Sequence, residues 1–338
     1  MKKKLFLNYK SLIGLLISFL GLYLGFRKFD IEEFFDAMAS ANLLYFLAAM
    51  AIMVFLIFLR AWRWKYILAP VKKIALRRTF ATEMIGYFGN NVFPLRLGEL
   101  LRSYSLGKSE EISSVTAFGT IVVERSLDTL AFVVIMLIGA MTYENMPDWV
   151  QQGAQIGIIG FGVLLIILVV LILNKKNLEA FIENKFGKYS DTKIFQFLEN
   201  LIHGLVALKR NPYTVVILAQ SLLIMVVNIF FFWVIGLIFG NYLALSAVLL
   251  IYFVTSAVIA VPSSPGYVGT YHAGAIGILQ VLGFGLSEAQ ALAVIMHAAG
   301  FIPLTIIGGI YFMKYHININ EFEKESVVKK EQSGDLSK

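Results

Sequence analysis

The chain has 338 residues, of which 58% are hydrophobic and 15% are charged, whereas a soluble domain carries roughly 25% charged residues. Its mean hydropathy is +0.75, and the apolar runs leave no room for a separate soluble catalytic domain of roughly 100 to 150 residues. The net charge of +7 is typical of cytoplasmic loops that face anionic lipids, and it does not indicate nucleic-acid binding. Because cysteine is absent, disulfides and thiolate chemistry are excluded. These values predict a polytopic integral membrane protein.

Two apolar runs begin the chain, at residues 11–26 and 43–60. The first is followed by charged residues and has no small-residue cleavage site, so we expect a retained span and not a secretory signal. After the second comes a basic segment without acidic residues, in which Trp62 and Trp64 are expected at the membrane interface. Its basic residues are Arg60, Arg63, Lys65, Lys72, Lys73, Arg77 and Arg78. The positive-inside rule places this segment and the N-terminus in the cytoplasm.

The next stretch contains an interrupted apolar sequence, GYFGNNVFPLRLGELLR at residues 86–102. The apolar span after it, 114–143, leads into an acidic loop, ENMPDW, which is expected outside. Charge parity then requires residues 79–113 to begin and end in the cytoplasm, as a re-entrant helix–break–helix element, which must be buried in protein or line a wet cavity. A full crossing at 79–97 is the alternative. The amides of Asn90 and Asn91 are suited to satisfying the broken backbone or to donating to a ligand.

The second half contains another interrupted element, in which the apolar run 242–262 meets VPSSPGYVGTYH and is followed by a short apolar piece, 273–283. Two prolines and two glycines there exclude a continuous helix. The other predicted elements are spans at 156–173, 212–239 and 288–312, and a basic loop at 174–211. An amphipathic helix in this loop is predicted to lie on the inner membrane surface or to pack on the bundle. A disordered cytoplasmic tail is predicted at 314–338.

The expected fold is therefore an all-α polytopic membrane bundle, with one transmembrane domain over residues 1–313. It has six full spans and two interrupted, re-entrant elements, which makes eight membrane elements. Paired broken helices in opposite halves are typical of transporters with inverted repeats and a site at the midplane. From this pairing we hypothesise an inverted repeat. The sequence itself shows no residue-by-residue internal repeat.

Three charges, on Glu124, Arg125 and Asp128, lie well inside the span at 114–143. A charge near the centre of a membrane helix costs about 2.5 to 3.5 kcal/mol on insertion scales, so these side chains must be paired or hydrated. The spacing puts both carboxylates on one helical face with the guanidinium beside them. One interpretation is a path for a substrate or ion. The other is a structural ion-pair network that locks this helix to the element at 79–113.

Both breaks carry groups suited to an anion. Arginine offers planar, bidentate donors for a phosphate, and the first break delivers Arg96 and Arg102 with Glu99 between them. The alternative there is an amphipathic cytoplasmic helix with snorkelling arginines. In the second break, Ser263 and Ser264 can cap a half-helix whose free amides attract anions, and the alternative is a simple Pro-Gly kink. The scattered histidines offer no metal-ligand spacing, so neither a metal nor another cofactor is predicted.

Three motifs, NNVFPLRLGELLR (90–102), VVERSLD (122–128) and PSSPGYVGTYH (262–272), resemble the flippase-like membrane family over about residues 10–313. Its relatives include the membrane part of lysyl-phosphatidylglycerol synthase, the multiple peptide resistance factor, and membrane regions of archaeal dolichol-linked glycosylation proteins. The matching positions are Asn90 or Asn91, Pro94, Arg96, Gly98, Glu99, Glu124, Arg125, Asp128, Pro265, Gly266 and Gly269. His272 stands where an acidic residue often closes the third motif, so a proton-linked or cation-binding role of that carboxylate does not carry over.

The resemblance implies a lipid-handling protein, expected to be a flippase for an anionic phospholipid or a polyprenyl-phosphate lipid, and not an enzyme. The expected binding residues are Asn90, Asn91, Arg96, Glu99, Arg102, Glu124, Arg125, Asp128, Ser263, Ser264, Gly266, Gly269 and His272. The alternatives are a membrane-embedded lipid-linked glycosyl or phospho-group transferase and an accessory subunit of a cell-envelope glycolipid assembly pathway. We expect anionic lipids as partners and a plasma-membrane location with both termini in the cytoplasm. The sequence leaves the oligomeric state open.

Overall fold

A computed structural model of the chain describes residues 9–142, 211–260 and 263–317. These ranges form ten α-helices and two short 3-10 helices, and no strand occurs among them, so the all-α prediction is confirmed. Three of these helices are long and apolar enough to cross a membrane, or four if one bent pair counts as a single span. The predicted span at 156–173, the amphipathic loop up to residue 210, and the tail beyond Ile317 lie outside the described residues.

The first half of the bundle begins with two helices that meet at a sharp bend. The angle between α1 and α2 is 88°, and Asp30 at the bend accepts hydrogen bonds from the backbone N–H groups of Glu32 and Glu33, which caps α2. The elements of this half are α1 (Tyr9–Phe26), α2 (Ile31–Ser40), α3 (Leu43–Leu68), α4 (Leu76–Val92), η1 (Pro94–Arg96), α5 (Gly98–Glu110) and α6 (Ser114–Thr142).

Helix α3 is longer than the sequence predicts. It continues past the expected end at Arg60 to Leu68, so that Arg60 and Arg63 belong to the helix and not to a loop. Trp64, expected at the interface, is fully buried, and its Nε1 donates to Thr120 Oγ1 of α6 at 2.9 Å. The prediction was wrong here because arginines beside tryptophans are typical of a span end, whereas these side chains find partners inside the bundle.

Helices α4 and α5 form a hairpin, which we call hairpin 1. Lys72, just before α4, lies 2.5 Å from the carbonyl oxygen of Glu110 at the end of α5, and Arg78 lies 3.4 Å from the Glu110 carboxylate. The element therefore returns to the end of the bundle from which it starts. Pro94 begins the 3-10 turn at its tip, where proline can follow a helix but not continue it.

The second half repeats this order of a long helix, a hairpin and a long helix. Its elements are α10 (Thr214–Leu237), α11 (Leu245–Ala260), η3 (Pro265–Tyr267), α12 (Thr270–Val281) and α13 (Leu286–Lys314). Asn241, between α10 and α11, donates to the Glu288 carboxylate at the start of α13 at 2.9 Å. The pair α11–α12, which we call hairpin 2, therefore also begins and ends at one end of the bundle.

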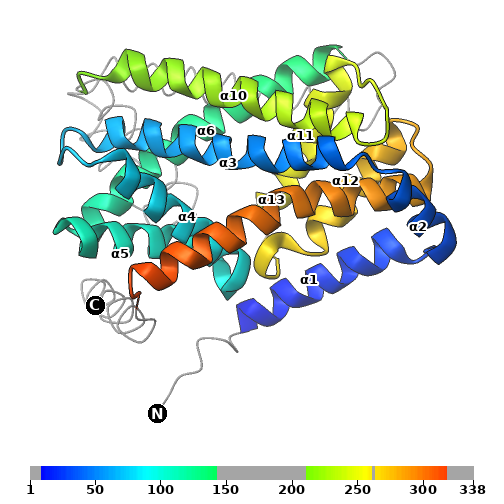
Figure 1. Ribbon diagram of the computed structural model, residues 1–338, viewed down its shortest axis with the longest axis horizontal. Helices are drawn as coiled ribbons and strands as arrows, with labels where there is room; N and C mark the ends of the chain where they lie inside the picture. Colours follow the sequence, from blue (N-terminus) through cyan, green and yellow to red (C-terminus); the bar gives the residue numbers. More distant parts are fainter. Residues whose placement is uncertain (1–8, 143–210, 261–262, 318–338) are drawn as a thin grey trace, which may run out of the picture.

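The two hairpins enter from opposite ends. At the end that holds the base of hairpin 1, Asn211 donates to the Tyr66 carbonyl at 3.0 Å; at the other end, the Asn42 N–H donates to the Ile238 carbonyl at 2.9 Å. Helix α3 connects these ends and is roughly 39 Å long at 1.5 Å per residue. Figure 1 shows hairpin 1 entering from the left and hairpin 2 from the right. This arrangement is the order expected of an inverted repeat.

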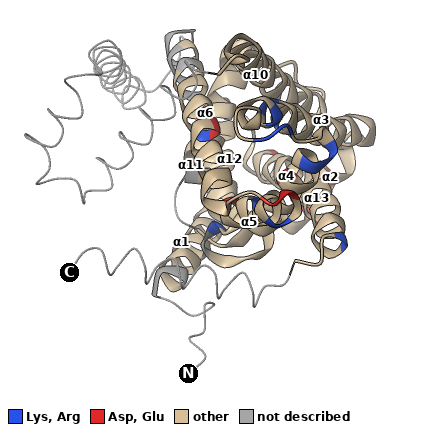
Figure 2. Ribbon diagram, turned by 90° about the vertical axis from the view of Figure 1, so that its left-hand side faces the viewer, with Lys and Arg blue, Asp and Glu red and all other residues tan. Residues whose placement is uncertain are grey.

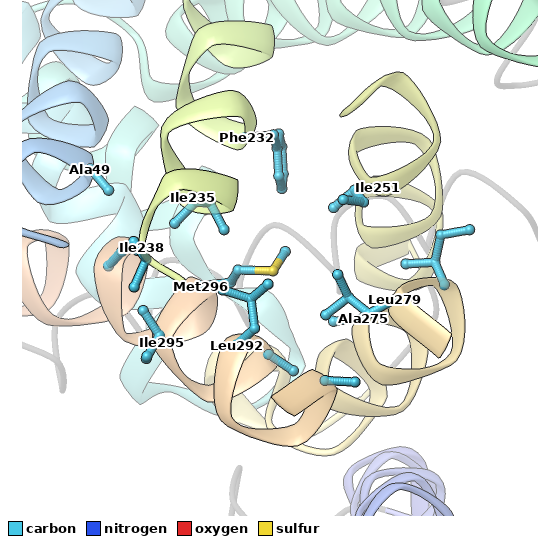
Figure 3. Close-up of a cluster of buried hydrophobic side chains, with 14 of the residues drawn as sticks. Ala49, Phe232, Ile235, Ile238, Ile251, Ala275, Leu279, Leu292, Ile295 and Met296 are labelled. Atoms are coloured by element: carbon cyan, nitrogen blue, oxygen red, sulfur yellow. The ribbon is translucent and has the colours of Figure 1, made fainter. Parts of the chain in front are cut away.

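An apolar core holds hairpin 2 between the long helices of the second half. Figure 3 shows side chains of this core, from α3, α10, α11, α12 and α13. The labelled residues are Ala49, Phe232, Ile235, Ile238, Ile251, Ala275, Leu279, Leu292, Ile295 and Met296. Because these side chains are aliphatic or aromatic and lie in contact, the core fixes the hairpin by close packing.

Helix α1 contacts hairpin 2 through its small residues. Ser18 Oγ accepts a hydrogen bond from the Ser264 N–H at 2.8 Å. A Cβ added at Gly14 would lie 3.1 Å from the Ser263 carbonyl oxygen, and one at Gly21 would lie 2.7 Å from that of Gly269. The missing side chains thus let the two backbones touch, as in small-residue packing between membrane helices.

Candidate functional site

Seven charged side chains from four helices form one group inside the bundle, which we call the buried charge network. Its members are Arg60, Arg63, Glu83, Arg102, Glu124, Arg125 and Asp128. Figure 2 looks along the bundle from the left of Figure 1 and shows coloured charged segments among α3, α4, α5 and α6, while most of the ribbon is uncharged. Fully ionised, the four guanidinium groups exceed the three carboxylates by one positive charge.

Asp128 on α6 is held by two arginines from α3. Arg60 Nη1 lies 2.5 Å from Asp128 Oδ2, and Arg63 Nη2 lies 2.6 Å from Oδ1. Arg63 Nη1 also donates to Ser221 Oγ of α10 at 3.0 Å. The carboxylate therefore receives one charge-assisted hydrogen bond on each oxygen, which is the strong form of this interaction.

Arg102 on α5 joins hairpin 1 to α6. Its Nη2 forms ion pairs with Glu83 of α4 and, at 2.6 Å, with Glu124. The guanidinium carbon also lies 3.7 Å from the centre of the Trp64 ring. The Arg102 side chain is 3% exposed and both carboxylates are 0% exposed, so this arginine does not snorkel to the surface. The ion-pair lock between α6 and the element at 79–113 is present.

Arg60, Arg63 and Glu83 were not among the predicted site residues. The two arginines follow an apolar run beside tryptophans, the usual signal of an interface. Glu83, however, lies between apolar residues in the segment FATEMIGYF. An acidic residue inside such a segment needs a partner at membrane depth, and this signal could have identified it.

Arg125 differs from the other arginines of the network in its accessibility. Its side chain is 41% exposed, whereas that of Arg60 is 12% and that of Arg63 is 1% exposed. It retains neighbouring acids, with 3.1 Å to Glu124 and 3.7 Å to Asp128. A guanidinium that is oriented by carboxylates on one side and open on the other can accept a further anion.

The tip of hairpin 1 carries the second polar group. Asn90 Oδ1 accepts from the Gly98 N–H at 2.9 Å, which bridges the helix break as expected, and Asn90 Nδ2 donates to Glu99 at 3.4 Å. Asn91 donates to Thr305 Oγ1 of α13 at 2.8 Å. The asparagine amides are thus used within the protein, and they fix the tip against α13.

Arg96, at this tip, reaches across to hairpin 2. Its Nη2 donates to Ser263 Oγ at 3.3 Å, and the guanidinium carbon lies over the Tyr267 ring, 4.7 Å from its centre. The predicted residues of the two breaks therefore lie side by side. Glu99 of the same tip lies on α5 three residues before Arg102, on the same side of the helix, so the tips and the buried charge network adjoin.

The turn of hairpin 2 is closed by hydrogen bonds of its own. His297 Nε2 lies 2.6 Å from the Gly266 carbonyl oxygen and donates to it. The Gly269 N–H, at the start of α12, donates to His272 Nδ1 at 3.4 Å. This amide is therefore occupied, whereas the sequence predicted an amide free to bind an anion. Ser264 Oγ donates to the Val268 carbonyl at 2.9 Å and does not cap a helix. The prediction missed that the turn itself and α1 occupy these groups.

In the described part of the chain, no group of three or more His, Cys, Asp or Glu residues is placed to hold a metal ion. What the geometry offers is a set of guanidinium groups beside fixed carboxylates. Such a set is suited to binding an anionic group and orienting it.

Comparison with known proteins finds relatives that match most of the length of this chain. It is 27% identical to a UPF0104 membrane protein of Methanocaldococcus jannaschii over 89% of this chain and 94% of that protein. It is 22% identical to a UPF0104 membrane protein of Methanothermobacter thermautotrophicus, over 82% of this chain and 87% of that protein. A second M. jannaschii UPF0104 membrane protein is 24% identical over 69% of this chain and 96% of its own length. No solved structure matches the chain.

The sequence profile described as "Lysylphosphatidylglycerol synthase TM region" matches residues 11–308. This range contains both hairpins and every member of the buried charge network. The chain therefore belongs to the family of the lysylphosphatidylglycerol synthase transmembrane region.

Proposed function

We propose that this membrane protein binds an anionic phospholipid or a polyprenyl-phosphate lipid and moves it across the plasma membrane, with both chain termini in the cytoplasm. The observation that carries the proposal is the meeting of the two hairpin tips, which enter from opposite ends and bring Arg96 against Ser263. In transporters, broken helices that meet in this way surround the substrate at the membrane midplane. Family membership supports a lipid as the substrate class.

The position of the tips is consistent with a site at the midplane. Helix α4 has 17 residues and spans about 26 Å at 1.5 Å per residue, about two thirds of the estimated length of α3, so the tip lies inside the bundle. We propose that both hairpins are re-entrant elements and that irregular backbone is tolerated at their tips because protein surrounds it. A headgroup between the tips would then lie within the membrane, away from both of its surfaces.

The residues divide by exposure into two roles. Arg96 and the accessible Arg125 contact the phosphate of the headgroup, and Glu99 orients them. The deeply buried pair Arg102–Glu124, with side chains 3% and 0% exposed, holds the scaffold and does not meet the lipid. Movement of the lipid is passive or coupled to an ion.

The test is lipid movement in liposomes that contain the purified protein and either fluorescent phosphatidylglycerol or a fluorescent polyprenyl phosphate. Arg125→Ala removes a charge-assisted contact worth about 1.5 to 3 kcal/mol, so transport falls about tenfold or more. Glu99→Gln lowers transport less, because it removes only the orienting charge. Arg77→Ala and Glu111→Gln, both at exposed positions away from the tips, are the matched controls and leave transport unchanged.

Wild-type protein that moves none of these lipids would overturn the proposal. Formation of a new product from a lipid-linked sugar or phosphate would instead favour the membrane-embedded transferase, in which Glu99 or Asp128 is the general base. An accessory subunit would show neither activity until its partner is added.

A further inference from the structure

We infer that Tyr267 positions the Arg96 guanidinium for contact with an anionic headgroup. This inference rests on the proposed function and deepens it, because it adds a residue that carries no charge and belongs to the opposite hairpin. Tyr267 is therefore a positioning residue, which acts through Arg96.

The first argument is the geometry of the contact. The guanidinium carbon of Arg96 lies over the Tyr267 ring, 4.7 Å from its centre, within the range of a cation–π interaction. A ring covers one face of the planar guanidinium and leaves the N–H donors at its edge, which is where a phosphate binds bidentately. One of these donors already points to Ser263 Oγ at 3.3 Å, a neutral partner that a phosphate oxygen can replace.

The second argument is backbone strain on both sides of the contact. Arg96 has φ of 53° and Tyr267 has φ of 61°, a left-handed conformation that costs energy for any residue with a Cβ and that glycine adopts freely. Each hairpin tip thus places a bulky residue where the backbone favours glycine, and these two residues contact each other. Strained positions of this kind persist where their side chains serve a site.

The third argument is that the turn that carries Tyr267 is fixed in place. The Tyr267 N–H donates to the Ser264 carbonyl at 3.1 Å, and the preceding Gly266 carbonyl accepts from His297 of α13 at 2.6 Å. A Cβ at Gly266 would lie 2.6 Å from the Phe301 ring, so the turn is also pressed against α13. Helix α13 therefore holds the ring in place, and the ring holds Arg96.

The experiment measures binding of fluorescent phosphatidic acid to the purified full-length protein in detergent micelles, with equally labelled phosphatidylcholine as the zwitterionic comparison. Tyr267→Phe keeps the aromatic face and binds phosphatidic acid as the wild type does. Tyr267→Ala removes a cation–π contact of about 1 kcal/mol and weakens binding about fivefold. In an Arg96→Ala background, the same Tyr267→Ala substitution has no further effect.

A second variant separates positioning from folding. Tyr267→Gly removes the ring and also relieves the left-handed strain, so it unfolds at a higher temperature than Tyr267→Ala while both bind phosphatidic acid equally weakly. If affinity instead follows the unfolding temperature, the role is only structural and the inference is overturned.

The remaining outcomes discriminate between the two proposals. A fivefold loss from Tyr267→Ala that persists without Arg96, or no loss at all, overturns the inference and leaves the proposed function standing. If the wild type binds neither phosphatidic acid nor a fluorescent polyprenyl phosphate more tightly than phosphatidylcholine, both proposals fall.

Discussion

The two hairpins have the same order of helix, 3-10 turn and helix, but only hairpin 1 is tied to a neighbouring helix by an ion pair. Hairpin 1 carries eight charged residues between Leu76 and Glu110, and Arg102 ties it to α6 through an ion pair with Glu124. Hairpin 2, from Leu245 to Val281, carries no Asp, Glu, Lys or Arg. It is fixed by an apolar core and by backbone contact with α1. Hairpin 1 thus adds buried ion pairs to its apolar packing, whereas hairpin 2 is held by packing and hydrogen bonds without ion pairs.

This difference has a physical consequence for each tip. Buried ions must be satisfied by specific partners, and the loss of one partner leaves an uncompensated charge. An element that is held by close packing does not depend on a charged partner. It does not, however, tolerate an added side-chain atom where two backbones touch. The two hairpins should therefore fail under different substitutions, and each of the following experiments addresses this comparison.

The largest effect is expected from labelling introduced cysteines at the hairpin bases. Lys73→Cys and Ser113→Cys flank hairpin 1, Tyr242→Cys and Gly285→Cys flank hairpin 2, and all four positions are exposed. A membrane-impermeant maleimide labels the first pair only from the cytoplasmic side of the membrane and the second pair only from the outside. Each position thus changes from full labelling to none when the reagent is moved to the other side.

The unsubstituted chain contains no cysteine and provides a blank. Should Lys73→Cys and Ser113→Cys react from opposite sides, hairpin 1 would be a full crossing and the symmetry between the hairpins would be lost.

The next largest effect is expected from Arg102→Ala. This substitution leaves the buried carboxylates of Glu83 and Glu124 without their shared cation, so the free energy of unfolding falls by about 3 to 5 kcal/mol. Tryptophan fluorescence during denaturation in detergent measures the change.

Arg78→Ala is the matched control. Arg78 is 40% exposed and pairs with Glu110 at the hairpin base at 3.4 Å, so its loss costs less than about 1 kcal/mol. Equal effects of the two substitutions would show that ion pairing does not hold hairpin 1.

A smaller effect is expected from Gly269→Ala in hairpin 2. Gly269 has φ of 95°, which alone costs an alanine about 1 to 3 kcal/mol, and the added Cβ would strike the Ser18 carbonyl of α1. The same unfolding measurement applies.

Gly277→Ala in the same helix provides the control, since nothing lies within 4 Å of its added Cβ. Alanine there favours the helix by up to about 1 kcal/mol. Destabilisation by Gly277→Ala that matches that by Gly269→Ala would mean that contact with α1 is not what fixes this hairpin.

Both breaks were predictable from the sequence because their signals are local. Pro94 and Pro265 interrupt apolar runs, and the glycines at 266 and 269 both have positive φ. The fold-back of residues 79–113 followed from the charges of the flanking loops. The need to pair Glu124 and Asp128 followed from their depth in an apolar helix.

The partners of those acids were not predictable in the same way. Arg60 and Arg63 are 65 to 68 residues away from Asp128, and nothing in the local pattern distinguishes a paired arginine from one at an interface. The same holds for the amide of Gly269, which the sequence left open. That amide is occupied by His272 of the same turn, and the Ser18 carbonyl that packs on Gly269 is known only once α1 is placed beside α12.

The ion pairs between α3 and α6 also order events during biosynthesis. Arg60 and Arg63 leave the ribosome 65 to 68 residues before Asp128, a delay of roughly 3 to 14 seconds at ordinary elongation rates. In the proposed orientation, α3 presents two unpaired cations through that interval, and these count toward cytoplasmic retention of its end. The arrival of α6 pairs both with Asp128. In that orientation, the same two side chains serve first as a topology signal for the translocon and then as interior structure of the finished protein.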